Sequence, residues 1–163
     1  MAEYWYFADG FEERVRGHLN SSAEAEVDLD FTVPEKDFNT AGKGSSELKN
    51  LLKRLGVDSD ILRRIAVASY EAEINVAAHS KGGLMKSAVH DDLIHVSFID
   101  DGPGIADIEQ AMLPGFSTAD DLVRELGFGA GLGLPNIQKN SDAMHIVSGK
   151  GSSTLLEFFI FFG

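Results

Sequence analysis

The sequence contains no cysteine, which excludes a disulfide-bonded scaffold and a metal site built from thiolates. It also lacks long hydrophobic runs, since no segment approaches the roughly 20 apolar residues that a membrane span requires. The first residues have neither the basic region nor the long apolar region of a secretion signal. We therefore expect a cytoplasmic protein that does not associate with membranes.

Basic residues are scarce: 14 lysines and arginines stand against 26 aspartates and glutamates, for a formal net charge of −12. An acidic surface without a basic run repels nucleic acid and anionic lipid, so we expect neither as a partner. A phosphate-bearing ligand would have to be held locally, by backbone N–H groups, a helix N-terminus or a metal ion.

The chain of 163 residues is long enough for one domain with a real hydrophobic core, and its apolar content of 44% is ordinary for one. Residues 1–24 differ from the rest, because "EYWYF" holds four aromatics in five positions and an acidic, small-residue connector follows. We expect this segment to be an N-terminal arm preceding a domain over residues 25–163. Two interpretations stay open: a capping helix or arm that packs its aromatics on the core, or an arm that contacts a partner.

Hydrophobic periodicity predicts the elements of the remaining chain. We expect strands over residues 27–33, 84–89, 93–99, 143–149 and 154–162, and helices over residues 48–55, 60–79, 106–113 and 134–142. Strands joined mostly by hairpins, with helices gathered on one face, indicate an α/β fold. Its architecture would be a two-layer α/β sandwich with a mixed, mostly antiparallel sheet.

Three polar residues, Glu71, Asn75 and His79, recur every four positions along the second predicted helix and therefore share one face. Such a stripe is commonly no more than a solvated face. The alternative is chemical: the Asn75 oxygen can bind a hard cation such as Mg²⁺, and the Glu71 carboxylate beside it can accept a proton.

The run "DDGPGI" follows a predicted strand and places Asp100 before Gly102 and Gly104. A hairpin turn is the simple interpretation, but the chain continues into a helix and not into a return strand. A carboxylate at this point can accept from an exocyclic amine, while bare glycine backbone lets a flat ring approach closely.

The stretch "GFGAGLGLPNI" alternates glycine with apolar residues and runs directly into a helix. Clustered N–H groups at a helix N-terminus suit a phosphate, although flexible loops can look similar. A dinucleotide-binding interpretation is disfavoured because no strand directly precedes the glycines, and the Walker-A pattern is absent from the sequence.

In order along the chain, E-x-x-x-N, D-x-G-x-G-I and G-x-G-x-G-L resemble the GHKL (Bergerat-fold) ATP-binding superfamily over about residues 25–162. The resemblance implies ATP and Mg²⁺ as ligands, with Glu71 as the general base and Asn75 as the metal ligand. It implies that Asp100 contacts the adenine amino group, and that Ser152 in "KGSS" supplies a supporting hydroxyl.

The remaining implied site residues are the adenine-pocket residues Gly102, Gly104 and Ile105, the phosphate-loop residues Gly129, Gly131, Leu132 and Gly133, and Arg124 near the γ-phosphate. Residues 113–128 would form a short lid over the nucleotide. His79 is expected to be a histidine that packs at the helix end.

Within the superfamily, the chain looks most similar to the anti-sigma factor and stress-response switch kinases. We expect no phospho-acceptor helical hairpin and no transducer domain, which histidine kinases and gyrase-type ATPases require. The resemblance implies transfer of the ATP γ-phosphate to a serine or threonine of a STAS-domain partner, in preference to a sigma factor as partner, and is consistent with a homodimer. The alternative is a nucleotide-dependent switch that sequesters a partner without phosphoryl transfer.

Overall fold

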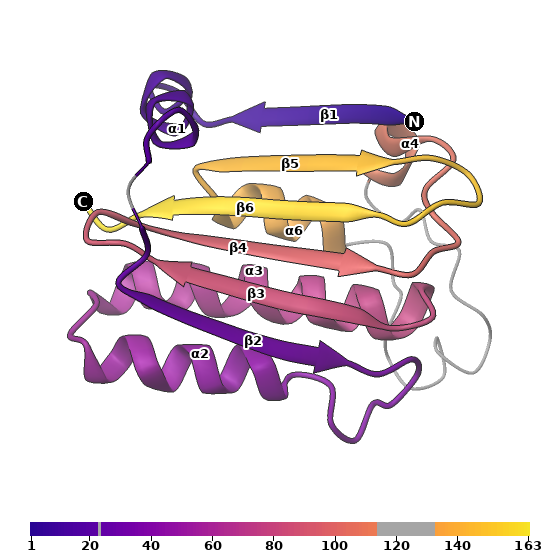
Figure 1. Cartoon of the computed structure of the whole chain (residues 1–163), viewed down its shortest axis with the longest axis horizontal. Helices are drawn as coiled ribbons and strands as arrows, with labels where there is room; N and C mark the ends of the chain where they lie inside the picture. The colour runs from indigo at the N-terminus through magenta and orange to yellow at the C-terminus, as the bar shows by residue number, and fades with distance from the viewer. Residues whose placement is uncertain (23, 114–132) are drawn as a thin grey trace.

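The computed structural model describes residues 1–22, 24–113 and 133–163, which form a six-stranded sheet covered by helices (Figure 1). The elements in chain order are β1 (Ala2–Phe7), α1 (Glu12–Leu19), β2 (Val27–Val33), α2 (Lys43–Arg54), α3 (Ser59–His79), β3 (Gly83–Val89), β4 (Leu93–Asp100), α4 (Ile108–Ala111), α6 (Gly133–Asn140), β5 (Ala143–Ser148) and β6 (Leu155–Phe161). The strand order is β1-β5-β6-β4-β3-β2, and all these neighbours pair antiparallel. The predicted α/β sandwich is thereby confirmed. Among the described helices, none combines the length and the apolar character that a bilayer crossing requires.

The main core lies between the sheet and helices α2, α3 and α6, which cover one face together (Figure 1). The sequence of strand β6 is apolar almost throughout because side chains on both of its faces are buried. Phe158 and Ile160 point to the helices, whereas Phe159 and Phe161 point to the other face and join a smaller cluster with Val15 of α1. Because both faces of this strand pack against other parts of the protein, its sequence does not alternate regularly between polar and apolar residues.

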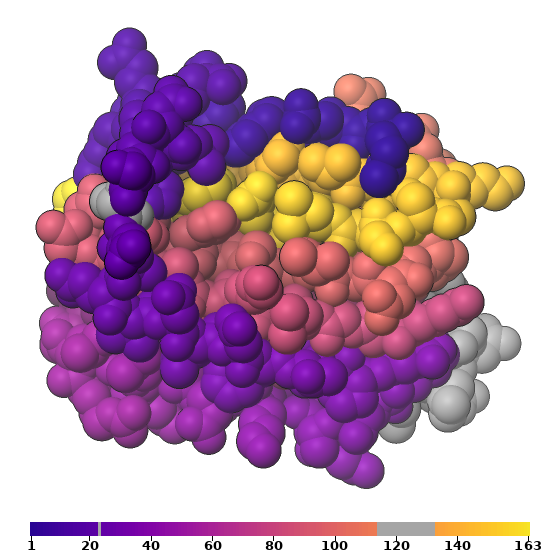
Figure 2. All heavy atoms as spheres, in the orientation of Figure 1, coloured from indigo at the N-terminus to yellow at the C-terminus, as the bar shows by residue number. Residues whose placement is uncertain are grey.

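The N-terminal segment is a strand followed by a helix, and β1 extends the sheet by pairing with β5 from Ala2↔Ser148 to Phe7↔Ala143. Helix α1 and the chain that follows it then cover one end of the face that lacks α2, α3 and α6 (Figure 2). Tyr4 packs on the main core and Trp5 on the smaller cluster, so the aromatics do pack on the core. The strand itself is not predicted by the sequence pattern, because aromatics on both faces conceal the alternation. The division of the chain into an arm over residues 1–24 and a domain over residues 25–163 stays a prediction.

A polar ladder crosses the face that lacks α2, α3 and α6. Glu157 of β6 accepts hydrogen bonds from His95 of β4 and His145 of β5, and His145 also contacts Glu3 of β1 at 2.7 Å. Burial alone would raise the pKa of Glu157, but the hydrogen bonds to the two imidazoles outweigh it, and the pKa is lowered. The ladder therefore joins β1 to the centre of the sheet through side chains as well as backbone.

Helix α6 is fixed by hydrogen bonds at its C-terminal end. Arg64 of α3 donates from Nη2 to Asp142 Oδ1 at 2.8 Å and from Nε to the Asn140 carbonyl oxygen at 3.1 Å. The second oxygen of Asp142 accepts from the Phe161 N–H at 2.8 Å. Charge-assisted bonds of this kind join helix, turn and sheet, and they hold the C-terminal end of α6 against α3 and β6.

Helix α2 has no side chain at its own N-cap, because that residue is Gly42. Its first N–H groups are bonded instead by Glu73 of α3, which is only 3% exposed. The carboxylate accepts from the Gly44 N–H at 3.2 Å, from the Ser45 N–H at 2.9 Å and from the Ser45 hydroxyl at 2.6 Å. A negative charge at a helix N-terminus is favourable, so Glu73 docks α2 on α3.

Replacing Glu73 by alanine leaves these buried donors without partners. We expect Glu73→Ala to lower the free energy of unfolding by roughly 2–4 kcal/mol, since an unsatisfied buried donor costs about 1–3 kcal/mol. Glu47→Ala, on the exposed side of α2, is the matched control and should change it by less than about 0.5 kcal/mol. Urea denaturation measures the free energy of unfolding of both variants. Equal losses of this free energy in the two variants would contradict the docking role of Glu73.

Candidate functional site

Helix α3 presents the predicted polar stripe to a partly open region. Glu71, Asn75 and His79 are each half-buried, whereas the residues between Glu71 and Asn75 are buried. A solvated stripe would be exposed along its whole length. The stripe is therefore partly covered along its length and is not a freely solvated face.

The N-terminus of α6 meets this stripe at Gly133. A Cβ atom built on Gly133 would lie 3.4 Å from Asn75 Oδ1 and 3.5 Å from Glu71 Oε2. Gly133, the last glycine of the third motif, is thus a neighbour in space of the first motif. Because glycine has no side chain, the start of α6 approaches both oxygens and leaves room beside them.

Glu71 also has a partner that the sequence pattern does not indicate. Burial raises the pKa of the Glu71 carboxyl group, and a hydrogen bond with the Asn136 side chain lowers it in part. Asn136 lies one helical turn into α6, so its position follows from the packing of α6 on α3. A carboxylate whose pKa is raised is a stronger proton acceptor once ionised.

Asp100 ends β4 and links two loops. Its Oδ1 accepts from the Gly102 N–H at 2.8 Å and from the Thr154 N–H at 3.0 Å. Burial raises the pKa of Asp100, while these two hydrogen bonds act to lower it. Among the described residues, Oδ2 has no hydrogen-bond partner, so the side chain is positioned through one oxygen and can accept from a ligand through the other.

The glycines after Asp100 let two loops come into contact. Gly104 has φ +86°, and a Cβ atom there would collide with the carbonyl oxygen of Gly149. Across the same contact, the Ile105 N–H donates to Ser148 Oγ at 2.8 Å. Only glycine satisfies both the backbone angle and the close approach at position 104. Gly102 has φ +95° and lies in the same loop.

The predicted hydroxyl of Ser152 has a different partner from the one expected. Its Oγ donates to the Gly149 carbonyl oxygen at 2.7 Å and so closes the turn between β5 and β6. Thr154 is the hydroxyl residue bonded to Asp100 through its N–H, and its Oγ1 lies 2.6 Å from Ser148 Oγ. The run "SST" offers three hydroxyls in succession, and the sequence motif alone does not select among them.

Several predicted residues lie outside the described part of the chain: Arg124, Gly129, Gly131 and Leu132. Their roles stay predictions, as does the lid over residues 113–128, of which the structure describes only the first. Within the described residues, no group of three or more histidine and acidic side chains is arranged to hold a metal ion. A cation bound at Asn75 would therefore need oxygen atoms from its substrate and from water.

The fold is shared with two solved structures. The RsbU and RsbW domains of Rv1364c from Mycobacterium tuberculosis match with a TM-score of 0.55 and 19% identity, over 82% of this chain and 32% of that one. The SiaB–SiaC complex from Pseudomonas aeruginosa matches with a TM-score of 0.58 and 13% identity, over 92% of this chain and 98% of that one. At these identities the likeness concerns the fold alone.

Sequence comparison identifies closer relatives, although no family model matches the chain. The anti-sigma F factor of Clostridium beijerinckii is 31% identical over 101 residues, which are 58% of this chain and 67% of the relative. That of Caldanaerobacter subterraneus is 28% identical over 105 residues, 64% of this chain and 66% of the relative. By its relation to these anti-sigma F factors, and with the three motifs in order along its sequence, the chain belongs to the anti-sigma factor (switch-kinase) branch of the GHKL superfamily.

Proposed function

We propose that this chain is a Mg²⁺- and ATP-dependent serine/threonine protein kinase that phosphorylates a STAS-domain protein. The observation that carries the proposal is the meeting of Glu71, Asn75 and Gly133, which puts a proton acceptor, an oxygen ligand and a helix N-terminus around one space. Phosphoryl transfer requires positioning and charge neutralisation more than covalent chemistry, and this set of groups offers both.

The adenine base would lie against the loop after β4. Asp100 is held by two backbone N–H groups and keeps Oδ2 as an acceptor for the exocyclic amine. Gly102, Gly104 and Ile105 provide a thin wall beside it. The phosphates would then extend towards Gly133 and the predicted loop residues Gly129, Gly131 and Leu132.

Asn75 fits a magnesium site in its donor chemistry, because Mg²⁺ prefers oxygen ligands and keeps several waters and phosphate oxygens in its shell. When bound, Mg²⁺ neutralises charge on the transferring phosphoryl group. Asn75 would hold the ion through Oδ1, the atom that faces Gly133.

In the transfer step, the serine or threonine oxygen of the partner forms a bond to the γ-phosphorus. The bond between that phosphorus and the β,γ-bridging oxygen breaks, and its electron pair leaves with ADP. The hydroxyl proton passes to the Glu71 carboxylate, which the Asn136 side chain orients. Arg124, if the resemblance to the lid of related kinases holds, adds positive charge near the γ-phosphate.

The partner class follows from the relatives. The matched proteins are anti-sigma F factors, so a protein of sigma-factor regulation is the expected partner, with a STAS-domain antagonist as the phosphate acceptor and a sigma factor as the less favoured choice. The SiaB neighbour forms a complex with SiaC, so partner binding is found in a protein of this fold. A nucleotide-dependent switch that sequesters a partner without transfer is the second candidate function.

Glu71→Gln tests the transfer step. With labelled ATP and a candidate STAS protein, we expect transfer to fall by roughly 10²–10⁴-fold, the usual contribution of a general base, while ATP binding remains. Glu47→Gln, which is exposed on α2, should transfer label at the parental rate. If the unmodified chain retains the partner in a nucleotide-dependent way but never labels it, the sequestering switch replaces the kinase.

Asp100→Asn tests the adenine contact. The amide can still accept the two N–H bonds through its oxygen, but it presents a donor where the adenine amine needs an acceptor. We expect ATP affinity in calorimetry to fall by about 10–100-fold, the range for losing a hydrogen bond to a charged group. Asp101→Asn, at the exposed neighbouring position, is the control, and an unchanged affinity in Asp100→Asn would refute the assignment.

Asn75→Ala tests the metal ligand. ATP binding by the unmodified chain should strengthen as magnesium is added, because the ion links the phosphates to the protein. In Asn75→Ala the affinity should be the same with and without magnesium, whereas Asn50→Ala on the exposed side of α2 should keep the dependence. Identical magnesium titrations for the parent and Asn75→Ala would show that another residue holds the ion.

A further inference from the structure

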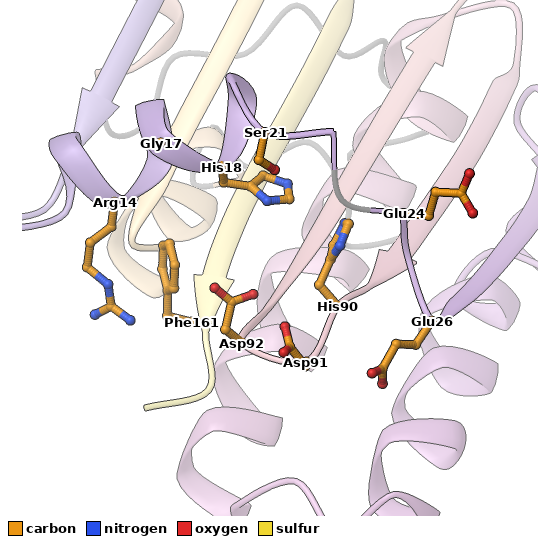
Figure 3. Close-up of a pocket in the computed structure, with 10 residues that line it drawn as sticks. All are labelled: Arg14, Gly17, His18, Ser21, Glu24, Glu26, His90, Asp91, Asp92 and Phe161. Carbon is orange, nitrogen blue, oxygen red and sulfur yellow. The ribbon is translucent and has the colours of Figure 1, made fainter.

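A hollow of about 510 Å³ lies at the far end of the sheet from Asp100, between α1, the turn joining β3 to β4, and the segment before β2 (Figure 3). Strand β4 runs from this turn to Asp100, and its eight residues span roughly 25 Å. A ligand in the hollow would therefore leave the candidate nucleotide site free.

The hollow has an excess of carboxylates. Its lining includes Glu24, Glu26, Asp91 and Asp92, and none of the four has a side-chain hydrogen bond or ion pair among the described residues. Arg14 is the cationic side chain of the lining, but its Nη2 donates to the Gly163 carbonyl oxygen at 3.0 Å and its Cζ lies 4.1 Å above the Phe161 ring. Among the described residues, the four carboxylates of the lining therefore have no cationic side chain in contact with them.

A buried imidazole without a hydrogen bond points into the same space. His90 is only 9% exposed, and neither ring nitrogen is hydrogen-bonded within the described part of the chain. Its ring contacts His18 edge-on, with centroids 4.5 Å apart, and is directed into the hollow (Figure 3). A largely buried side chain whose ring nitrogens have no protein partner and face the hollow is the second sign of a ligand.

We propose that the hollow binds the guanidinium group of an arginine side chain from a protein partner. The acceptors lie on different walls: Asp91 and Asp92 on the turn, Glu26 on the segment before β2, and the His90 ring between them. A guanidinium donates in several directions within one plane and also stacks on aromatic rings, whereas an ammonium is a compact point charge.

His18 favours the same ligand over a metal ion. Burial lowers the pKa of His18, and the neighbouring His90 and His95 lower it further, while Asp92 acts to raise it; the net lowering favours the neutral ring, which has an acceptor nitrogen. Among the described residues, no group of three or more histidine and acidic side chains is arranged to hold a metal ion, in this hollow or elsewhere. This inference does not depend on the proposed kinase activity.

The test uses Nα-acetyl-arginine methylamide as the probe and follows the imidazole signals of the whole chain by NMR. We expect saturable shifts of the His90 ring with half-saturation at millimolar probe. The matched control is Nα-acetyl-citrulline methylamide, which has nearly the same shape without the charge and should bind at least tenfold more weakly. Equal binding of the two compounds, or shifts that never saturate, would overturn the proposal.

A pair of double variants separates a built site from general attraction to an acidic protein. Asp91→Asn with Asp92→Asn should weaken the arginine probe at least tenfold. Asp28→Asn with Asp30→Asn removes the same charge from exposed positions of β2 and should leave binding unchanged. An equal loss of probe affinity in the two double variants would show that net charge alone attracts the probe. Binding of Zn²⁺ at micromolar concentration that shifts the NMR signals of both His18 and His90 would assign the hollow to a metal. Either result refutes the proposal.

Discussion

Helix α6 packs along helix α3, and the candidate site exists where this packing brings Gly133 against Glu71 and Asn75. The position of α6 is set some distance from the chemistry, by the bonds of Arg64 to Asn140 and Asp142 and by the bond of Asp142 to the backbone of β6. The same packing brings Asn136 to the Glu71 carboxyl group. The proposed metal ligand Asn75, the proposed proton acceptor Glu71 and Gly133 therefore depend on one helix pair, and a salt bridge fixes the other end of this pair.

Much of the fold could be predicted from sequence, because most elements have one clear periodicity. Strand β2 alternates strictly and has the bounds that were predicted. Helix α2 carries its leucines on one face and was predicted from them over residues 48–55, but it begins five residues earlier, at Lys43, in a stretch predicted to be a loop. Strand β1 could not be predicted in the same way, since its aromatics pack, partly buried, on both faces and leave no alternation to detect. The motifs likewise predicted Glu71, Asn75 and Asp100, which carry side chains of distinctive chemistry at fixed spacing.

The supporting residues could not be predicted, for a physical reason. Glu73, Asn136 and Thr154 act through contacts between segments distant in sequence, and each belongs to a run in which a neighbour looks equally suitable. Glu73 and Glu71 lie on different faces of α3, and Glu73 points to α2 whereas Glu71 points to α6. This difference has a consequence only after α2 and α6 have packed on α3. Thr154, and not Ser152, bonds to Asp100 because the register of β6 places the Thr154 N–H beside it; the hydroxyl group plays no part in that bond.

Tyr4 gives the N-terminal strand a further significance. Its hydroxyl group donates to Gln138 Oε1 at 2.7 Å, so the outermost strand of the sheet is attached to the helix that begins at Gly133. Anything that displaces β1, such as trimming of the first residues or competition from another chain for the flank of β5, would release one of the restraints on α6. Through Tyr4, the amino-terminal strand therefore restrains the helix that presents Gly133 to the candidate site.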